Sequence, residues 1–382
     1  MALTLWGSVG WAAPGLDTRP VVGPYLDGAF PAATPGSGGN YSWVNAFPNL
    51  TFISPIRMFP EPGSTRLWVI GREGHVWFFD GANANTSSKT LALDISDVTQ
   101  GRGDCGLLGF AFHPEFGQAG SPNANYIYLY HNFSLTPTQS GEPSSVISCN
   151  RLSRFSVNPV TKVINRASEL ILINQFDQHA WHNGGDMFFG PDGFLYLCNG
   201  DEGSSNDPWD NAQSITKGLF AGVFRIDVDQ KGGTISHPIR RQPIANATPP
   251  AGWPGTFTQG YYIPNDNPFV DPAGGKLEEF YAVGLRSPHR MTRDAVTGKV
   301  FIGDIGQGTQ EEVSMLDGPG LNFQWPFREG ATSGPKAQPS PLIGTSRPPL
   351  HAYGRSVGGC VIGGFVYRGT EHAGDLAGKY IF

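Results

Sequence analysis

The sequence predicts an all-β fold of the β-propeller type, and three features carry that prediction. The chain has 382 residues with 52 glycines and 32 prolines, well above average usage. Charged residues make up only 15%, which argues against a helical bundle or a coiled coil. The third feature is a unit that recurs at irregular intervals: a turn, a short strand of aromatic or branched residues, and an exit rich in glycine and aspartate. Such repeats are typical of propeller blades, although the irregular spacing leaves an ordinary β-sandwich as the alternative.

The first 42 residues are predicted to stand apart from the propeller domain, which we assign to residues 43–382. The segment MALTLWGSVGWAAPG is similar to the apolar centre of a signal peptide, although it lacks a positively charged start. Residues 14–42 are rich in Pro, Gly, Ala and Ser without periodicity, as expected of an exposed lead-in. We therefore expect export to the periplasm or to the outside of the cell.

Strand signals begin near residue 50. Residues 67–70, the turn GREG and residues 75–79 predict a hairpin. Alternating aromatics predict a strand over 126–130, and turns lead into further strands at 194–197 and 299–302. Two Pro-rich insertions, 231–275 and 327–352, interrupt this rhythm. Long loops on a rigid β scaffold usually carry binding residues.

Charge and hydropathy exclude several partners. The formal charge of −6 gives no electrostatic footprint for nucleic acid, and no apolar run reaches the roughly 18 residues needed to span a bilayer. The four cysteines, which lack the CxxC spacing of a zinc or redox site, fit either two disulfides or buried free thiols; they are Cys105, Cys149, Cys198 and Cys360.

Four glycine-rich segments carry the residue types that chemistry needs. Asp104 precedes a strand-like run, where it either faces a cavity or caps a turn. His179 and His182 lie beside a Gly-Gly bend, where a neutral imidazole makes a plausible general base, whereas His113, before a proline, reads as a packing or turn residue. Arg286 is fixed near a proline and suits an anion, with a surface salt bridge as the alternative.

The fourth segment is GDIGQGTQEE (303–312). Free carbonyls and nearby carboxylates in a glycine-rich loop suit a hard cation such as Ca²⁺, although the regular spacing of a calcium loop is absent. The common signatures of serine hydrolases, zinc proteases and nucleotide-binding proteins are also absent.

Taken in order, these segments resemble the glucose/sorbosone dehydrogenase family, which includes soluble quinoprotein glucose dehydrogenases and fungal quinoprotein pyranose dehydrogenases. The matching stretches are GLLGFAFHPEF (106–116), HNGGDMFFGPDGFLYLCNGDEG (182–203), NDPWDNAQ, GLFAGVFRIDVD, YAVGLRSPHR, GDIGQGTQEEV, NFQWPFREG and VIGGFVYRG. The resemblance implies a six-bladed propeller of four-stranded antiparallel blades. It also implies pyrroloquinoline quinone (PQQ) bound with Ca²⁺, oxidation of the anomeric hydroxyl of a sugar, and an external electron acceptor.

The resemblance assigns roles to individual residues. His182 matches the base that removes the hydroxyl proton while hydride passes to the quinone. Arg286 matches the arginine that steadies negative charge on the quinone oxygen. Asp104 falls where the family has a polar residue contacting substrate and cofactor, and Ser287 occupies a second cofactor-contacting position. The calcium ligands are implied to be two backbone carbonyls, those of Gly306 and Gln307.

This chain departs from the family at several positions. Trp181 stands where glucose dehydrogenases have an acidic residue beside the base, so we expect His182 to lack that orienting partner. Ser287 replaces an asparagine, which leaves one cofactor hydrogen bond open, and Gln307 replaces a proline. The sequence stops at Phe382 in what reads as the entry to a further strand. We therefore expect an incomplete last blade, without the lysine and arginines that clamp the quinone carboxylates.

Two other function classes remain open from the sequence. One is a non-catalytic secreted binding propeller, as in the hedgehog-interacting relatives of the family, which the changes at Trp181 and Ser287 favour. The other is a calcium-dependent lactonase, which would need converging acidic and amide ligands that the sequence does not assemble. The sequence specifies neither the sugar, nor the acceptor, nor the oligomeric state.

Overall fold

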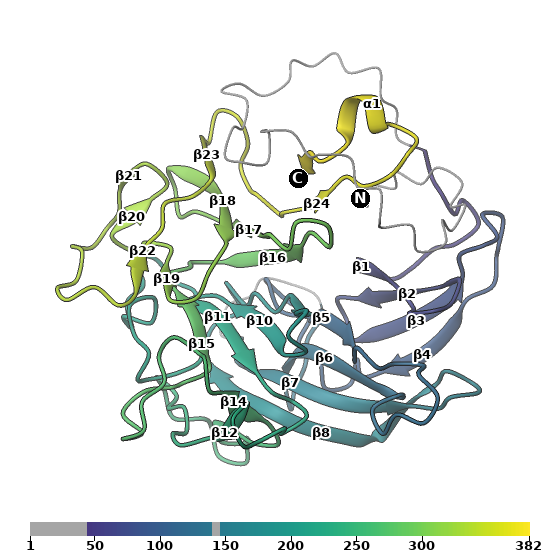
Figure 1. Cartoon of the computed structure of the whole chain (residues 1–382), viewed down its shortest axis with the longest axis horizontal. Coiled ribbons are helices and arrows are strands. Elements are labelled where there is room, and N and C mark those ends of the chain that lie inside the picture. The colour runs from purple at the N-terminus through teal and green to yellow at the C-terminus, as the bar shows by residue number, and fades with distance from the viewer. Residues whose placement is uncertain (1–43, 140–145) are drawn as a thin grey trace.

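In the computed structural model, residues 44–139 and 146–382 are described; the signal-like segment lies outside them. The described residues form strands and loops with one four-residue helix, α1 (Ala373–Leu376). Four sheets follow one another around a common centre, in chain order (Figure 1). The predicted all-β class is confirmed. No helix in these residues is long and apolar enough to cross a membrane.

Each of the four sheets contains a four-stranded antiparallel core. The first consists of β1 (Pro55–Pro60), β2 (Arg66–Gly71), β3 (His75–Asp80) and β4 (Thr90–Asp94). The second consists of β5 (Leu107–Phe112), β6 (Tyr126–Phe133), β7 (Ser148–Val157) and β8 (Ile164–Asp177), with β13 (Phe257–Thr258) added outside β8.

The third and fourth sheets repeat this order. The third consists of β9 (Met187–Phe189), β10 (Leu195–Asn199), β11 (Gly222–Ile226) and β15 (Phe280–Val283), extended in parallel by β19 (Leu321–Asn322) and β22 (Thr345–Ser346). The fourth consists of β16 (Pro288–Arg293), β17 (Val300–Asp304), β18 (Gln310–Leu316) and β23 (His351–Gly354). The hairpin predicted over 67–79 and the strands predicted near 126, 194 and 299 are all present.

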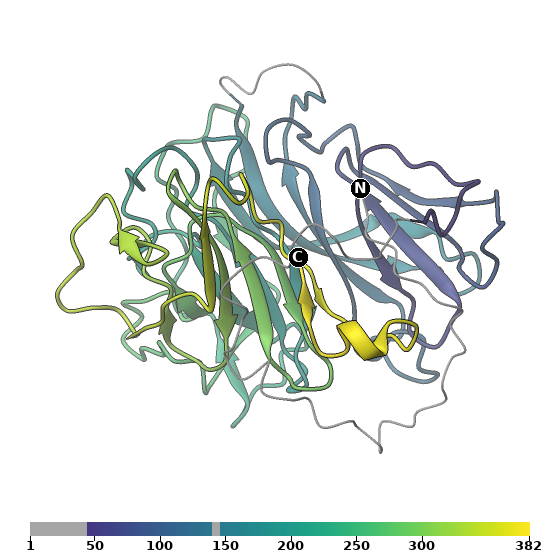
Figure 2. The same cartoon turned by 90° about the horizontal axis from the view of Figure 1, so that it is seen from above.

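Three two-stranded sheets complete the described chain: β12 (Ser236–Pro238) with β14 (Tyr262–Pro264), β20 (Arg328–Glu329) with β21 (Thr332–Ser333), and β24 (Phe365–Val366) with β25 (Tyr380–Ile381). The pair β24–β25 lies between the fourth and first sheets (Figures 1 and 2). Tyr380 stacks on Phe301 of β17, and Arg57 of β1 lies over the ring of Phe365. Six blades and a closed ring stay predictions.

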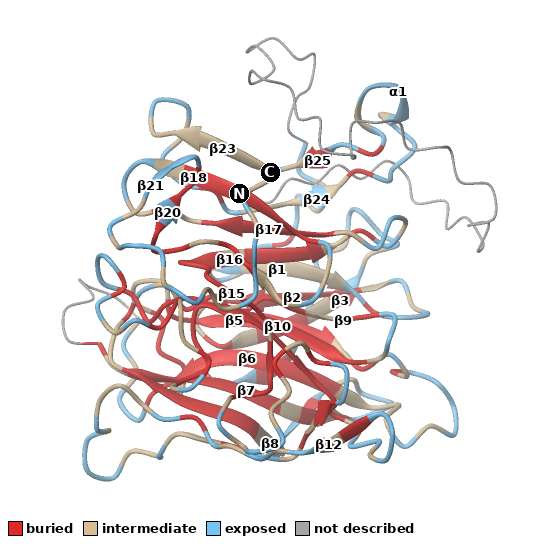
Figure 3. Ribbon diagram, turned by 60° about the vertical axis from the view of Figure 1, so that its left-hand side comes forward, coloured by how far each residue is buried: buried red, intermediate tan, exposed pale blue. Residues whose placement is uncertain are grey.

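The core lies between successive sheets, because each sheet covers the face of the next. Strands such as β10 and β17 are buried at every residue (Figure 3), so they lack the alternation of a strand with one solvent-exposed face. Apolar clusters join the first and second, second and third, and third and fourth sheets; representative pairs are Trp68 and Phe110, Leu172 and Phe224, and Val223 and Met291.

All four cysteines are free thiols in the structure. Cys105, Cys149 and Cys198 are buried, as the thiol interpretation predicted, whereas Cys360 is exposed. Burial raises the pKa of Cys149 to about 11.

Candidate active site

The residues predicted from the sequence lie in loops at one end of the sheets. Neighbouring strands run antiparallel, so the connections before β5, between β8 and β9, after β10, between β15 and β16, and between β17 and β18 all fall at the same end. Those connections carry Asp104, His182, Arg286, Ser287, Gly306 and Gln307.

The loop that carries His182 is fixed by Asp104. The backbone N of His182 donates to Oδ2 of Asp104 at 3.0 Å, and the backbone N of Asp104 donates to the carbonyl of Ala180 at 2.8 Å. His182 has a φ of 63°, in the left-handed region that costs a non-glycine residue about 1 kcal/mol or more. Asp104 therefore acts on the neighbouring loop and holds a strained backbone in place.

The imidazole of His182 is oriented by Asp201, a fully buried residue that follows β10. Nδ1 of His182 lies 2.6 Å from Oδ1 of Asp201. The same carboxylate accepts from the backbone N of Gly203 at 3.0 Å and from Nε1 of Trp325 at 2.8 Å. An ionised carboxylate only accepts, so Nδ1 carries the proton and Nε2 is the basic nitrogen. His182 therefore has an orienting carboxylate in place of the adjacent acidic residue, and this carboxylate comes from a different loop.

Gly200 brings the loops of His182 and Arg286 together. A Cβ at Gly200 would lie 2.0 Å from the carbonyl oxygen of His182 and 2.7 Å from that of Arg286. The carbonyl of Arg286 also accepts from the backbone N of Asp201 at 2.9 Å. Only glycine permits this approach, so the end of β10 lies directly between the two loops.

The guanidinium of Arg286 is held through one of its three nitrogens. Its Nη1 donates to the carbonyls of Ile305 and Gly306, each at 2.9 Å. Its Nε is buried and has no partner in the described part of the chain. The guanidinium carbon lies 5.4 Å from the ring centre of Trp325, the residue that also bonds Asp201. The site therefore combines a basic nitrogen with a fixed cation that can meet an anion.

Behind Arg286, a buried carboxyl fixes the backbone. Asp304 accepts from the backbone N of Ser287 at 2.6 Å and from that of Arg286 at 3.0 Å. Burial raises the pKa of Asp304 to about 6, although the two backbone hydrogen bonds act to lower the pKa. Burial, together with the charge of Asp304, raises the pKa of Glu312 on the neighbouring strand to about 8. Both carboxyls therefore change protonation state nearer to neutral pH than exposed carboxyls do.

The two carbonyls predicted to hold calcium differ in their surroundings. The Gly306 carbonyl accepts from Arg286 and, at 2.9 Å, from Nη2 of Arg355, whose guanidinium also pairs with Glu311. No hydrogen bond to the Gln307 carbonyl is found within 44–139 and 146–382, and its side chain pairs with Asn206. No group of three or more His, Cys, Asp or Glu side chains in the described residues is placed to hold a metal ion.

Three site residues were missed by the sequence reasoning. Asp201 and Trp325 lie within the motifs GDEG and NFQWPFREG, where the recurrence of aspartate after a strand was the available signal. Arg355 follows β23 and carried no signal. His113 hydrogen-bonds Asp229 at 3.0 Å and is buried, as expected of a packing residue.

Both insertions contact the turn that follows Asp201. Nδ2 of Asn246, in the first insertion, donates to Oδ1 of Asn211 at 2.9 Å. Nζ of Lys336, in the second, contacts the carbonyl of Asp207. The insertions therefore meet the rim of the site.

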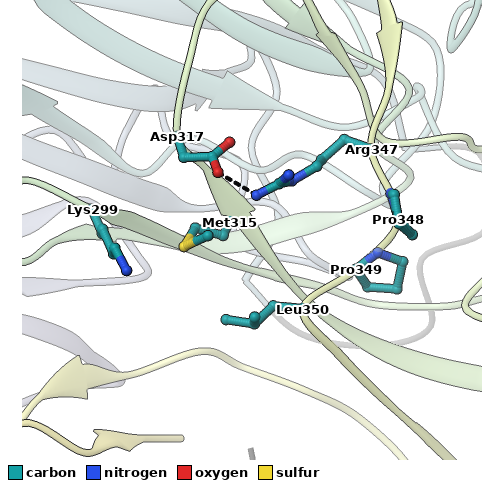
Figure 4. Close-up of a pocket in the computed structure, with 7 residues that line it drawn as sticks. All are labelled: Lys299, Met315, Asp317, Arg347, Pro348, Pro349 and Leu350. Atoms are coloured by element: carbon teal, nitrogen blue, oxygen red, sulfur yellow. Dashed lines mark hydrogen bonds and ion pairs between the residues drawn. The ribbon is translucent and has the colours of Figure 1, made fainter. Parts of the chain in front are cut away.

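A separate pocket lies at the other end of the fourth sheet (Figure 4). It is lined by the residue before β17, the end of β18 and the approach to β23, namely Lys299, Met315, Asp317, Arg347, Pro348, Pro349 and Leu350. Arg347 and Asp317 pair across it. Because β17 ends at Asp304 on the active-site side, this pocket shares no residue with the site.

The class of protein follows from this fold and these motifs together. Residues 53–246 and 256–381 match the family described as Glucose / Sorbosone dehydrogenase. The chain belongs to the glucose/sorbosone dehydrogenase family, as its motifs predicted.

Individual relatives show how far the similarity extends. HIPL1 protein from Arabidopsis thaliana is 28% identical over 373 residues, covering 86% of this chain and 50% of the relative. Human Hedgehog-interacting protein is 25% identical over 325 residues, covering 84% of this chain and 39% of the relative. The chain thus spans about half the length or less of these relatives.

Among solved structures, the PQQ-bound form of aldose sugar dehydrogenase from Streptomyces coelicolor shares the fold. It superposes with a TM-score of 0.51 at 23% identity, over 80% of this chain and 69% of that chain.

Proposed function

We propose that this protein oxidises an aldose at its anomeric hydroxyl, with PQQ as the electron acceptor within the site and an external acceptor after it. The observation that supports the proposal is that His182, oriented by Asp201, and Arg286 lie in two loops whose main chains meet at Gly200. The proposal includes a sugar as the substrate and export of the protein to the periplasm or outside of the cell.

The residues present fit an anionic quinone. Arg286 has a buried, unpartnered Nε and a guanidinium fixed by two carbonyls, so an anionic oxygen supplies the partner that this donor lacks. PQQ when bound would supply a two-electron acceptor, which no side chain provides.

Calcium fits this arrangement less well. The Gly306 carbonyl already accepts from two cationic groups, and a calcium ion there would have to take their place. The Gln307 carbonyl is available, and Arg355 is already paired with Glu311.

The chain's own residues perform the proton chemistry. Nε2 of His182 accepts the proton of the sugar hydroxyl, because Nδ1 holds its own proton against Asp201. The buried carboxylate then stabilises the imidazolium that forms. Arg286 stabilises negative charge that develops beside it.

The test is dye-linked oxidation of a panel of aldoses by purified protein incubated with PQQ and Ca²⁺. We choose His182→Asn, because asparagine tolerates the positive φ at this position. We expect it to bind PQQ, seen as a change in the cofactor's absorbance, and to lose oxidation. His75→Asn, on β3 of the first sheet, is the matched control. Full turnover by the His182 variant would refute the proposed base.

Calcium is tested in the same preparation. Arg355 is already paired with Glu311 and is not free to offset the charge of an anionic cofactor. A calcium-dependent site therefore predicts that EGTA lowers PQQ affinity about tenfold or more. Unchanged affinity would remove calcium from the proposal.

A binding propeller is the second candidate, and the similarity to HIPL1 protein and to Hedgehog-interacting protein favours it. It predicts a folded protein whose addition leaves the PQQ absorbance unchanged at any calcium concentration.

A further inference from the structure

Trp181, the residue before His182, has an unusual exposure. Its side chain is 43% exposed, and it is the only tryptophan among the exposed large hydrophobic residues of the described chain. Within 44–139 and 146–382 no ring or hydrogen-bond partner for its indole is found. Leaving an indole in water forgoes the burial that usually stabilises it, so its position next to the proposed base needs a reason.

The backbone of Trp181 is held rigidly. Ala180 on one side and His182 on the other are each hydrogen-bonded to Asp104. A Cβ at Gly203 would lie 3.0 Å from the carbonyl oxygen and 3.1 Å from the Cβ of Trp181, so Trp181 packs directly over that turn. Because the backbone of Trp181 is fixed, less conformational entropy is lost when a ligand contacts the indole.

A second aromatic pair lies on the same turn. The Cβ of His179 is 3.4 Å from the same point above Gly203, and the ring of His179 packs on that of Trp209 with centroids 4.8 Å apart. Burial and the nearby His182 lower the pKa of His179, so its ring is neutral at physiological pH. The part of the turn next to Trp181 is thus bordered by flat, uncharged rings.

We propose that Trp181 is a stacking platform for the C–H face of the sugar ring and thereby determines which aldopyranoses are accepted. The inference rests on the proposed function for the identity of the substrate. A pyranose whose hydroxyls are all equatorial presents a flat face of C–H bonds to an indole, whereas an axial hydroxyl interrupts that face and would have to lose its water against an apolar ring. Glucose-like sugars are therefore preferred over their axial epimers.

The experiment has two readouts. Saturation-transfer NMR on PQQ-free protein measures binding of methyl β-glucoside, which cannot be oxidised at C1, and dye-linked kinetics measure KM and kcat for glucose and galactose. For Trp181→Ala we expect about tenfold weaker binding and about tenfold higher KM for glucose, with kcat reduced less than about threefold. Trp181→Phe should retain most of the affinity. Val160→Ala, at a turn in which Val160 is 86% exposed, is the surface control.

The outcomes separate this inference from the proposed function. Wild-type affinity and KM in Trp181→Ala would overturn the platform while leaving the dehydrogenase intact, and so would unchanged discrimination between glucose and galactose. Absence of glucoside binding to the wild-type protein up to about 100 mM would also overturn it. Binding that depends on Trp181 without any oxidation would support the platform and refute the dehydrogenase.

Discussion

Replacing Asp201 with asparagine removes the carboxylate that orients the proposed base, His182, and so tests whether that orientation matters for the reaction. The carboxylate of Asp201 receives three hydrogen bonds: two at Oδ1, from His182 and Gly203, and one at Oδ2, from Trp325. The amide is nearly the same size but has one oxygen, and its nitrogen donates. Asp201→Asn therefore changes charge and hydrogen bonding with little change in volume.

The structure sets the expected magnitudes. If the amide oxygen stays at Oδ1, its nitrogen faces the N–H of Trp325, and one buried donor loses its acceptor, which costs about 1–3 kcal/mol. The charge that stabilises a protonated His182 is also lost. A positioned general base contributes about 10²–10⁴ to the rate, so we expect Asp201→Asn to lower kcat by at least about 10² at unchanged PQQ binding.

The assay pairs dye-linked kinetics with urea unfolding followed by circular dichroism. Asp97→Asn, an exposed aspartate paired with Arg166, is the control and should change neither quantity. A kcat within about threefold of wild type, alongside reduced stability, would show that Asp201 serves the fold alone. No change in either would mean that the three contacts are not made.

Two further predictions concern stability. Burial raises the pKa of Glu312 from 4.5 to about 8, so the folded protein holds a proton that the unfolded chain releases; the contribution is complete below pH 4.5 and is lost as the pH rises to about 8. Melting temperatures should therefore fall across this interval, and Glu312→Gln should flatten the decline; a slope equal to that of wild type would contradict this. Arg57 pairs with the fully buried carboxylate of Asp186, so Arg57→Met should lower the free energy of unfolding by about 3–5 kcal/mol. Adding Asp186→Asn should restore part of that loss in chemical denaturation, and a double variant less stable than Arg57→Met would count against the pair.

Much of the fold could be predicted because its signals are local. The strand around Phe301 and the hairpin around Trp68 combine β-branched or aromatic residues with turn residues on either side, and both are present. The number of blades and the closure of the ring depend on contacts between segments far apart in the sequence, and local sequence patterns do not predict such contacts.

The site was predictable only in part, for the same reason. His182 and Arg286 lie within motifs that the chain shares with its family, whereas the partner of His182 comes from a loop 19 residues further on. The family pattern places the carboxylate at the neighbouring position, where Trp181 stands in this chain. In the folded chain the carboxylate comes from Asp201 in another loop. Arg355 reaches the Gly306 carbonyl from 49 residues away, a contact that depends on the docking of β23 against β18.

The glycine between the two loops makes the proposed site sensitive to how the third and fourth sheets are positioned relative to each other. Base, carboxylate and arginine are contributed by separate connections, and Gly200 and the Arg286 carbonyl join their main chains. A small slip of one sheet against its neighbour would part these groups while leaving every strand intact. If the proposed oxidation is observed, its rate should therefore respond to inter-sheet alignment more sensitively than spectroscopic measures of strand content do.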